Sequence, residues 1–316
     1  TEMAFYLMEN YSDMLYSAGK GGYTVLHCAA YGGSIDIFNN VCEIMNATSE
    51  THYNISSDDN TSHCQKRADL KERTELEETF LHMACLSGKL EMTKYLVGKY
   101  PDMINEVNKH NASIAHYAAA AEGGNVSILE YLITQGSDPW CTTSSGQTLL
   151  HLSCISGRLE KTQYLLEKYP DMIKMTDKSN RTPSHYAAFR GNASLIQPLI
   201  NEGLDLWCGT AIQQTLLNRS CETGHLEIMK ELVKKFPDCI HRLDSNGETT
   251  AHYATVCGNL SVLQYLIEQG LNPWCRTATK ETLLHNSCIT GQLEMTQYLL
   301  EKYPDMINEV DNYKRT

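Results

Sequence analysis

Histidine is the first residue type whose spacing suggests chemistry, because its neutral imidazole is the commonest metal ligand. Seven of the 12 histidines stand three residues after a Thr or Ser, and most of these recur at intervals of about 34 residues or twice that. They are His27, His82, His116, His151, His185, His252 and His285. A zinc site needs three or four ligands around one ion, which copies so far apart do not provide. His52, His63 and Cys64 lie closer together, but three loose ligands are a weak signal, so we predict no metal and no cofactor.

The 12 cysteines contain no C-x-x-C pair and fall largely into two series. One series is Cys85, Cys154, Cys221 and Cys288; the other is Cys141, Cys208 and Cys275, and each of these precedes a member of the first by 13 residues. Free thiols packed as small apolar groups are one interpretation. A ladder of disulfides such as Cys141 to Cys154 is the alternative. No Ser–His–Asp or Cys–His arrangement separates from these recurring positions, so we predict that the chain is not an enzyme.

Asn-x-Ser/Thr sequences offer glycosylation chemistry, but only if the chain is secreted. The candidate acceptors are Asn46, Asn54, Asn60, Asn125, Asn192 and Asn259. The last three occupy one recurring position just before an expected helix. An asparagine there also makes sense as a helix N-cap.

Charge and hydropathy exclude several classes of partner. The 38 acidic and 26 basic residues give a net charge of -12. Nucleic acids and acidic membrane surfaces both require clustered Lys and Arg, so neither is an expected partner. No apolar run approaches the roughly 20 residues that cross a bilayer, so we expect no direct membrane insertion by this segment.

The elements that position these residues are internal repeats. The segment QTLLHLSCISGRLEKTQYLLEKYPDMI begins at Gln147, and ETLLHNSCITGQLEMTQYLLEKYPDMI begins at Glu281. We call this type A; related copies begin at Glu78 and Gln214. Type B copies begin at Ala112, Arg181 and Glu248. The two types alternate, so the genetic unit is a pair of about 67 residues and the structural unit has 33–34.

Each repeat predicts two short helices. In the copy from Gln147, the first helix is expected over residues 149–156, ended by Gly157 as a C-cap. The second is expected over residues 159–169, closed by Pro170, with leucines at helical spacing on one face. Neither helix buries its apolar face alone, so the repeats must stack. The predicted fold is all-α, an α-solenoid.

The T-x-L-H pattern, the following Gly and the 33-residue period together resemble the ankyrin repeat. The resemblance covers nearly the whole chain, although only Pro183 keeps that family's proline and Asn218 replaces one histidine. It implies helix-turn-helix repeats joined by hairpin loops. It also implies that the histidine ties neighbouring hairpins together by hydrogen bonds.

We expect one array over residues 1–316. The approximate repeats are 1–22 (partial), 23–77, 78–111, 112–146, 147–180, 181–213, 214–247, 248–280 and 281–316. Both ends fall inside a repeat, which predicts a fragment of a longer array that stacks on further repeats of its own chain at both ends. Residues 46–77 form an insert, with a mobile loop expected over 46–68 and a short solvated helix over 69–78.

By resemblance, hairpin tips and first-helix ends line a concave, partner-binding groove. The residues that differ there among copies are Lys109, His110, Ala112, Ser144, Ser145, Gln147, Ile155, Lys178, Ser179, Arg181, Phe189, Arg190, Ala211, Ile212, Gln214, Glu222, Ser245, Asn246 and Glu248. Phe189 and Arg190 are the most anchor-like pair, because aromatics and Arg dominate interface energies. The tryptophans Trp140, Trp207 and Trp274 either form a binding stripe or pack between repeats; we favour packing.

The function that follows is a non-enzymatic scaffold for binding other proteins in the cytoplasm. One alternative is an elastic or tethering cytoplasmic array of a membrane channel, which near-identical type A copies favour. Another is a secreted, glycosylated ankyrin-repeat assembly or toxin-like protein, which the Asn-x-Ser/Thr sequences and paired cysteines motivate.

Overall fold

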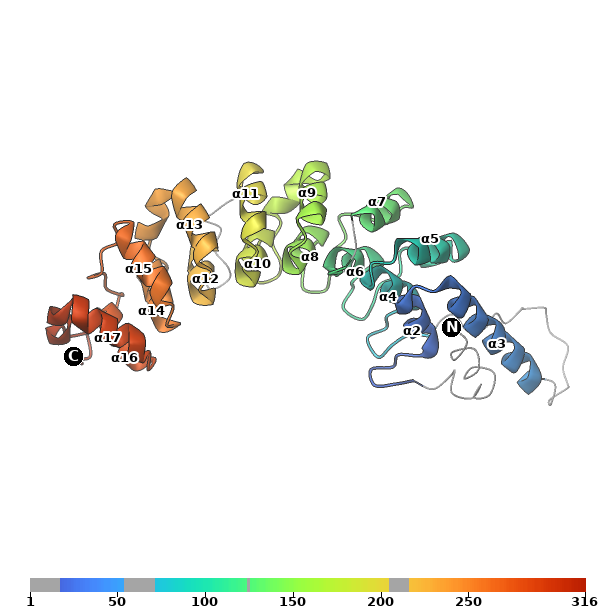
Figure 1. The fold of residues 1–316 in the computed structure, drawn as a ribbon, viewed down its shortest axis with the longest axis horizontal. Coiled ribbons are helices and arrows are strands. Elements are labelled where there is room, and N and C mark those ends of the chain that lie inside the picture. The colour runs from blue at the N-terminus through green and yellow to red at the C-terminus, as the bar shows by residue number, and fades with distance from the viewer. Residues whose placement is uncertain (1–17, 54–71, 124–125, 205–215) are drawn as a thin grey trace. The chain divides into compact units, whose positions relative to one another are not determined.

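A computed structural model describes residues 18–53, 72–123, 126–204 and 216–316 of the chain (Figure 1). The chain divides into two compact units, Thr1–Lys161 and Thr162–Thr316. Regular structure in the described residues is helical, apart from two isolated β-bridges that join Val107 to Ser113 and Arg276 to Thr282. The chain is therefore an all-α solenoid of helix-turn-helix repeats, as predicted.

In its described residues, the unit Thr1–Lys161 contains four helix pairs, of which the fourth is completed across its boundary. Its helices are α2 (Val25–Gly32), α3 (Ile35–Tyr53), α4 (Phe80–Leu86), α5 (Leu90–Lys99), α6 (Ile114–Ala120), α7 (Ser127–Thr134) and α8 (Leu149–Ser156), with a 3-10 turn η2 (Pro101–Met103). Helix α9 (Leu159–Lys168) crosses from this unit into the next. First helices stack on first helices, α2 on α4, α4 on α6 and α6 on α8.

The unit Thr162–Thr316 repeats this plan (Figure 1). It contains η3 (Pro170–Lys174), α10 (Pro183–Arg190), α11 (Ala193–Asn201), α12 (Leu216–Thr223), α13 (Leu226–Lys235), η4 (Pro237–His241), α14 (Thr250–Val256), α15 (Leu260–Glu268), α16 (Leu283–Ile289), α17 (Leu293–Lys302) and η5 (Pro304–Asn308). First helices α10, α12, α14 and α16 stack in order, and second helices α11, α13 and α15 stack beside them.

Local sequence signals set the helix ends. Thr148 caps α8, because its side chain accepts a hydrogen bond from the amide of His151. Gly157 ends α8 with φ 71°, a left-handed conformation that glycine adopts without strain. The predicted first helix is thus confirmed residue for residue. Pro170 cannot continue α9 and instead begins η3.

The insert differs from its prediction. Helix α3 continues to Tyr53, so residues 46–53 are helical where a loop was expected; residues 54–71 lie outside the described part. Residues 72–78 form the next repeat's hairpin turn, not a solvated helix. Thr74 closes this turn, since its amide donates to the Glu78 carbonyl at 3.0 Å and its hydroxyl accepts from the Glu78 amide at 3.1 Å.

Stacking buries one recurring isoleucine. Ile240 is 1% exposed, whereas Ile307, at the same position of the last repeat in the sequence, is 56% exposed. Ile240→Val is therefore expected to lower the free energy of unfolding by about 0.5–1.5 kcal/mol. The matched variant Ile307→Val should change it by less than about 0.5 kcal/mol. Urea denaturation compares the two, and equal losses would contradict burial by stacking.

Within the described residues, every helix is too short or too polar to span a bilayer.

Candidate partner-binding surface

The recurring histidines form a ladder that fixes the hairpins. In α4, the His82 Nδ1 accepts from the Thr79 amide at 3.1 Å. Its Nε2 therefore carries the proton and donates to the Ala112 carbonyl of the next repeat at 3.2 Å. Nε2 bonds of 3.0–3.2 Å to the following hairpin recur at His27, His116 and His285. These bonds are the role that the resemblance implied.

Burial keeps these imidazoles neutral. His82, His116 and His252 are fully buried. Desolvation of the charged ring lowers the pKa of each to about 4. Such rings are poor general acids or bases at neutral pH, so the ladder is structural. In the described residues no three His, Cys, Asp or Glu side chains are grouped to hold a metal; the side chains of His52, His63 and Cys64 lie outside them.

Most predicted partner-binding residues lie on the surface. The exposed ones are Lys109, His110, Ser144, Ser145, Lys178, Ser179, Phe189, Arg190, Ser245 and Asn246; Gln147, Ile155, Arg181, Glu222 and Glu248 are half-buried. The predicted residues Ala211, Ile212 and Gln214 lie outside the described residues. The exposed side chains sit on hairpins and helix ends held by the buried ladder.

Ala112 does not belong to the exposed partner-binding residues, although it was predicted to. It is only 8% exposed, because it lies at the hairpin base, where its carbonyl accepts from His82. Its amide donates to Asn108 Oδ1 at 2.9 Å. Both backbone groups are occupied and the methyl group is covered, so Ala112 is part of the frame.

The first-helix ends carry a row of apolar side chains. In the unit Thr162–Thr316, Phe189 is 47% exposed, Val256 37% and Ile289 59%. Each lies four residues after the ladder position of its repeat. Glu222 interrupts the row and pairs with Arg219 at 2.6 Å. The Arg219 guanidinium also lies 4.5 Å from the centre of the Phe189 ring, a cation–π contact.

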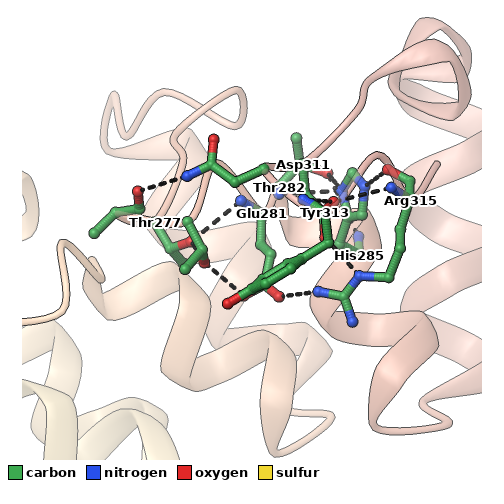
Figure 2. Close-up of polar contacts among 10 residues, drawn as sticks. Thr277, Glu281, Thr282, His285, Asp311, Tyr313 and Arg315 are labelled. Atoms are coloured by element: carbon green, nitrogen blue, oxygen red, sulfur yellow. Dashed lines mark hydrogen bonds and ion pairs between the residues drawn. The ribbon is translucent and has the colours of Figure 1, made fainter.

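Ion pairs hold two of the hairpins that lead into type B repeats. Arg181 and Asp177 pair at 2.8 Å, and the Tyr186 hydroxyl donates to the same carboxylate at 2.7 Å. These donors together outweigh burial and lower the pKa of Asp177. In the last hairpin, Arg315 contacts both Asp311 and Glu281 at 2.6 Å (Figure 2).

The prediction that the cysteines pack as small apolar groups holds for part of them. Cys85, Cys154 and Cys221 are fully buried, and Cys85 and Cys221 are free thiols, which fits the small apolar role; Cys288 is exposed. Cys141 and Cys275 are free as well, and each lies beside a ladder histidine, at 3.7 Å and 3.9 Å from Nδ1. Burial raises the pKa of both thiols, which disfavours reactive thiolates.

Trp274 touches the next repeat through an edge contact with Tyr303, with ring centres 6.4 Å apart. It is nevertheless 37% exposed, and Trp140 is 43% exposed, so packing between repeats covers these rings only in part. Trp207 lies outside the described residues.

The Asn-x-Ser/Thr asparagines have a structural use. Asn259 stands at the N-cap position of α15, but its side chain makes no cap. Its Nδ2 instead donates to the Cys221 and Glu222 carbonyls of the preceding repeat, at 2.6 Å and 3.0 Å. Asn192 occupies the same position before α11, also without a side-chain cap. Asn54, Asn60, Asn125 and the side chain of Asn46 lie outside the described residues.

Sequence reasoning missed Arg219, Asp177 and Lys161. The recurrence of Asp and Arg four residues apart, at 177 and 181 and again at 311 and 315, was an available signal for the hairpin pairs. Lys161 occupies the position that Met92, Ile228 and Met295 hold in the other type A copies, which was equally visible.

The sequence is similar to parts of several known proteins. Palmitoyltransferase AKR1 of Lachancea kluyveri is 28% identical over 201 residues, 63% of this chain and 22% of that protein. The target of rapamycin complex 2 subunit AVO2 of Saccharomyces cerevisiae is 30% identical over 158 residues, 49% of this chain and 37% of that protein. A Caenorhabditis elegans homologue of transient receptor potential cation channel subfamily A member 1 is 28% identical over 54% of this chain and 14% of its own length. The chain thus corresponds to well under half of each relative.

Family models give the assignment. One described as Ankyrin repeats (3 copies) matches residues 52–139, 116–210 and 190–277. Another, described as Ankyrin repeats (many copies), matches residues 258–300. Since these matches span most of the sequence, the chain belongs to the ankyrin repeat family.

Proposed function

We propose that this chain is a non-enzymatic scaffold that binds a partner protein through its hairpin tips and first-helix ends. Ankyrin repeats are protein-interaction modules in general. The observation that carries the proposal is the exposed apolar row of Phe189, Val256 and Ile289. Large apolar side chains held on rigid helices lose little entropy on binding, so their burial by a partner is efficient.

Phe189 and Arg190 provide the test. Peptides selected from a random displayed library on the full chain are titrated against the double variant Phe189→Ala/Arg190→Ala. Affinity is expected to fall at least about 10-fold, as for a hot spot of 1.4 kcal/mol or more.

Ser194→Ala/Gln197→Ala is the matched control, because both residues are exposed on the second helix of the same repeat. It should leave affinity unchanged. Equal affinity of wild type and the Phe189→Ala/Arg190→Ala variant, with the helical circular dichroism preserved, would exclude this face as the binding surface.

A cytoplasmic location is part of the proposal. The free thiols of Cys141 and Cys275 support it, because cysteines that recur in such series would tend to oxidise in secreted proteins. The occupied amide of Asn259 supports it too, since a glycan at Nδ2 would remove at least one of two inter-repeat hydrogen bonds.

A tether of a membrane channel is the second candidate. The near-identity of the type A copies favours it, because a mechanical array needs regular repeats more than a diverse surface. The similarity to the Caenorhabditis elegans channel homologue also supports it. Membrane-spanning segments encoded in the same full reading frame would decide for this candidate.

A further inference from the structure

The second helices of the repeats share one aromatic position. Five of the eight described second helices have a tyrosine there, namely Tyr95, Tyr131, Tyr164, Tyr265 and Tyr298. All five side chains are half-buried. The other three second helices have Asn40, Pro198 and Glu231 at this position. The surroundings of Pro198 show what remains where the ring is missing.

Tyr95 shows how such a ring packs. Its hydroxyl, on α5, donates a hydrogen bond to Asn39 Oδ1 on α3, the second helix of the preceding repeat. Lys99, one turn later on α5, donates to the Tyr95 hydroxyl and to the same Asn39 oxygen, both at 2.8 Å. The tyrosine therefore bridges two consecutive second helices.

Tyr265 and Tyr298 face the preceding second helix in the same way. Burial raises the pKa of Tyr265 on α15, and the charge of Lys230 on α13 opposes this rise. Burial, Tyr303 and Glu268 raise the pKa of Tyr298 on α17, and Glu268 lies on α15. Lys230 and Glu268 act on these hydroxyls because they lie nearby on the preceding second helix.

A pocket lies beside Pro198, where the ring is missing. It has a volume of about 200 Å³ and lies between α9 and α11, within the unit Thr162–Thr316 (Figure 1). The residues that line it are Gln163, Leu166, Glu167, Pro198, Asn201 and Glu202. Leu166 is 2% exposed and forms an apolar floor, whereas the four polar side chains are exposed and form the rim. Since a cavity of about 150 Å³ holds a benzene ring, this pocket has room for a phenol.

Two residues of the α9 wall stand at the positions that tyrosines of other repeats face. Gln163 occupies in α9 the position that Asn39 holds in α3 and Lys230 holds in α13. Glu167 occupies the position that Glu268 holds in α15. The pocket is therefore the place that the missing ring would fill.

The rim of the pocket also suits a hydroxyl group. Glu202 occupies in α11 the position of Lys99, whose ammonium contacts the Tyr95 hydroxyl. A carboxylate accepts the proton that a phenol donates, as Asp177 accepts from Tyr186 at 2.7 Å. Space for one ring, an apolar floor and an acceptor for its hydroxyl together match the side chain of tyrosine.

We propose that this pocket binds the side chain of a tyrosine presented by a partner protein. The ring packs on Leu166 and Pro198, and the hydroxyl meets Gln163 and Glu202 at the rim. The bound tyrosine takes the place that the chain's own tyrosines take between other second helices. Because the pocket lies on second helices, this inference goes beyond the scaffold surface proposed above, which uses hairpin tips and first-helix ends.

Nuclear magnetic resonance of the isotopically labelled full chain tests the site with two small probes. N-acetyl-tyrosinamide has the tyrosine side chain on a backbone blocked at both ends, as in a protein, and N-acetyl-serinamide lacks the ring. Shifts of the amide signals with increasing probe concentration give a Kd for each probe. The Kd of the tyrosine probe is expected to be at least about 10-fold lower, because only that probe buries a ring.

Two variants at position 198 locate the binding. Pro198→Tyr fills the pocket with the chain's own ring, and it should fold because it removes a proline from inside a helix. It is expected to abolish the preference for the tyrosine probe. Pro198→Ala is the matched control, since it also removes the proline but leaves the space open. It should keep the preference.

Equal Kd values of the two probes in the wild type overturn this inference. A tyrosine preference that survives in folded Pro198→Tyr, or that is lost in folded Pro198→Ala, overturns it too, because the missing ring would then not create the site. Free tyrosine is the control for the source of the ligand. Tighter binding of free tyrosine than of the blocked probe would identify an amino acid as the ligand and overturn the assignment to a partner protein. The Phe189→Ala/Arg190→Ala variant tests the scaffold surface separately.

Discussion

Lowering the pH from 7 to 4 is expected to remove about 6 kcal/mol of unfolding free energy from the unit Thr1–Lys161. His82 and His116 are buried there as neutral rings with pKa values of about 4, against 6.5 when unfolded. Between those values the unfolded chain binds more protons, so stability falls as the pH falls. Each ring contributes about 3 kcal/mol, and the loss levels off below pH 4. Urea denaturation at several pH values measures it.

The chain supplies its own control for this prediction. Asn218 occupies the ladder position of its repeat and is buried at 4% exposure, so an asparagine fits there. The variant His82→Asn/His116→Asn should be less stable than wild type at pH 7, because the Nε2 bonds to the next hairpin are lost. Its stability should nevertheless change far less between pH 7 and 4. The same steep loss in this variant would attribute acid sensitivity to carboxylates and not to the ladder.

The repeat fold was predictable because its signals are local. A Thr or Ser cap, a buried histidine and a left-handed Gly recur in most copies, and each acts within one helix. The extension of α3 to Tyr53 was not predictable from the apolar pattern, since residues 46–53 are largely polar. Once a helix is nucleated, adding a residue costs little, so it can continue past its buried face.

Most of the exposed residues could be predicted from the sequence, but the contacts between their side chains could not. Variation among copies identified Phe189 and Arg190 as exposed residues, and the structure places them so. The prediction that Ala112 is an exposed partner-binding residue was wrong, because a hairpin has a buried base as well as an exposed tip. The bond between Arg315 and Glu281 spans 34 residues, and such contacts depend on how neighbouring hairpins stack. Only the stacked geometry shows that a pocket lies beside Pro198.

Lys161 shows how the stack adapts to an irregular repeat. It is 1% exposed and occupies the position of Met92, which is fully buried. Its ammonium donates to the carbonyls of Ala118 and Ala121 at 2.8 Å and 2.6 Å. The repeat that contains these alanines is two residues longer after its first helix than the other type B copies. We infer that the longer connection turns two carbonyls toward the core, where a lysine can satisfy them.

A lysine should therefore be tolerated at position 161 and not at the same position of another type A repeat. Met295→Lys is expected to lower the free energy of unfolding by about 3–5 kcal/mol, the cost of a buried charge without partners. Met295 is 1% exposed, and the preceding type B repeat lacks the two extra residues. Its Val256 carbonyl already accepts from Gln292 Nε2 at 3.0 Å. Urea denaturation at pH 7 measures the loss.

Lys161→Met is the reciprocal variant, and it should change stability by less than about 1 kcal/mol at pH 7. Removing the buried ammonium raises the free energy of unfolding, and leaving two carbonyls unpaired lowers it by a similar amount. Measuring stability at several pH values separates these two effects. Burial and nearby Arg158 lower the pKa of Lys161 to about 8, against 10.5 for an ordinary lysine. Between pH 8 and 10.5 the unfolded chain binds more protons, so wild type should gain stability relative to Lys161→Met. Parallel curves for the two proteins would show that folding does not shift the pKa of Lys161. A Met295→Lys variant as stable as wild type would show that a type A repeat can bury a lysine without the longer connection before it.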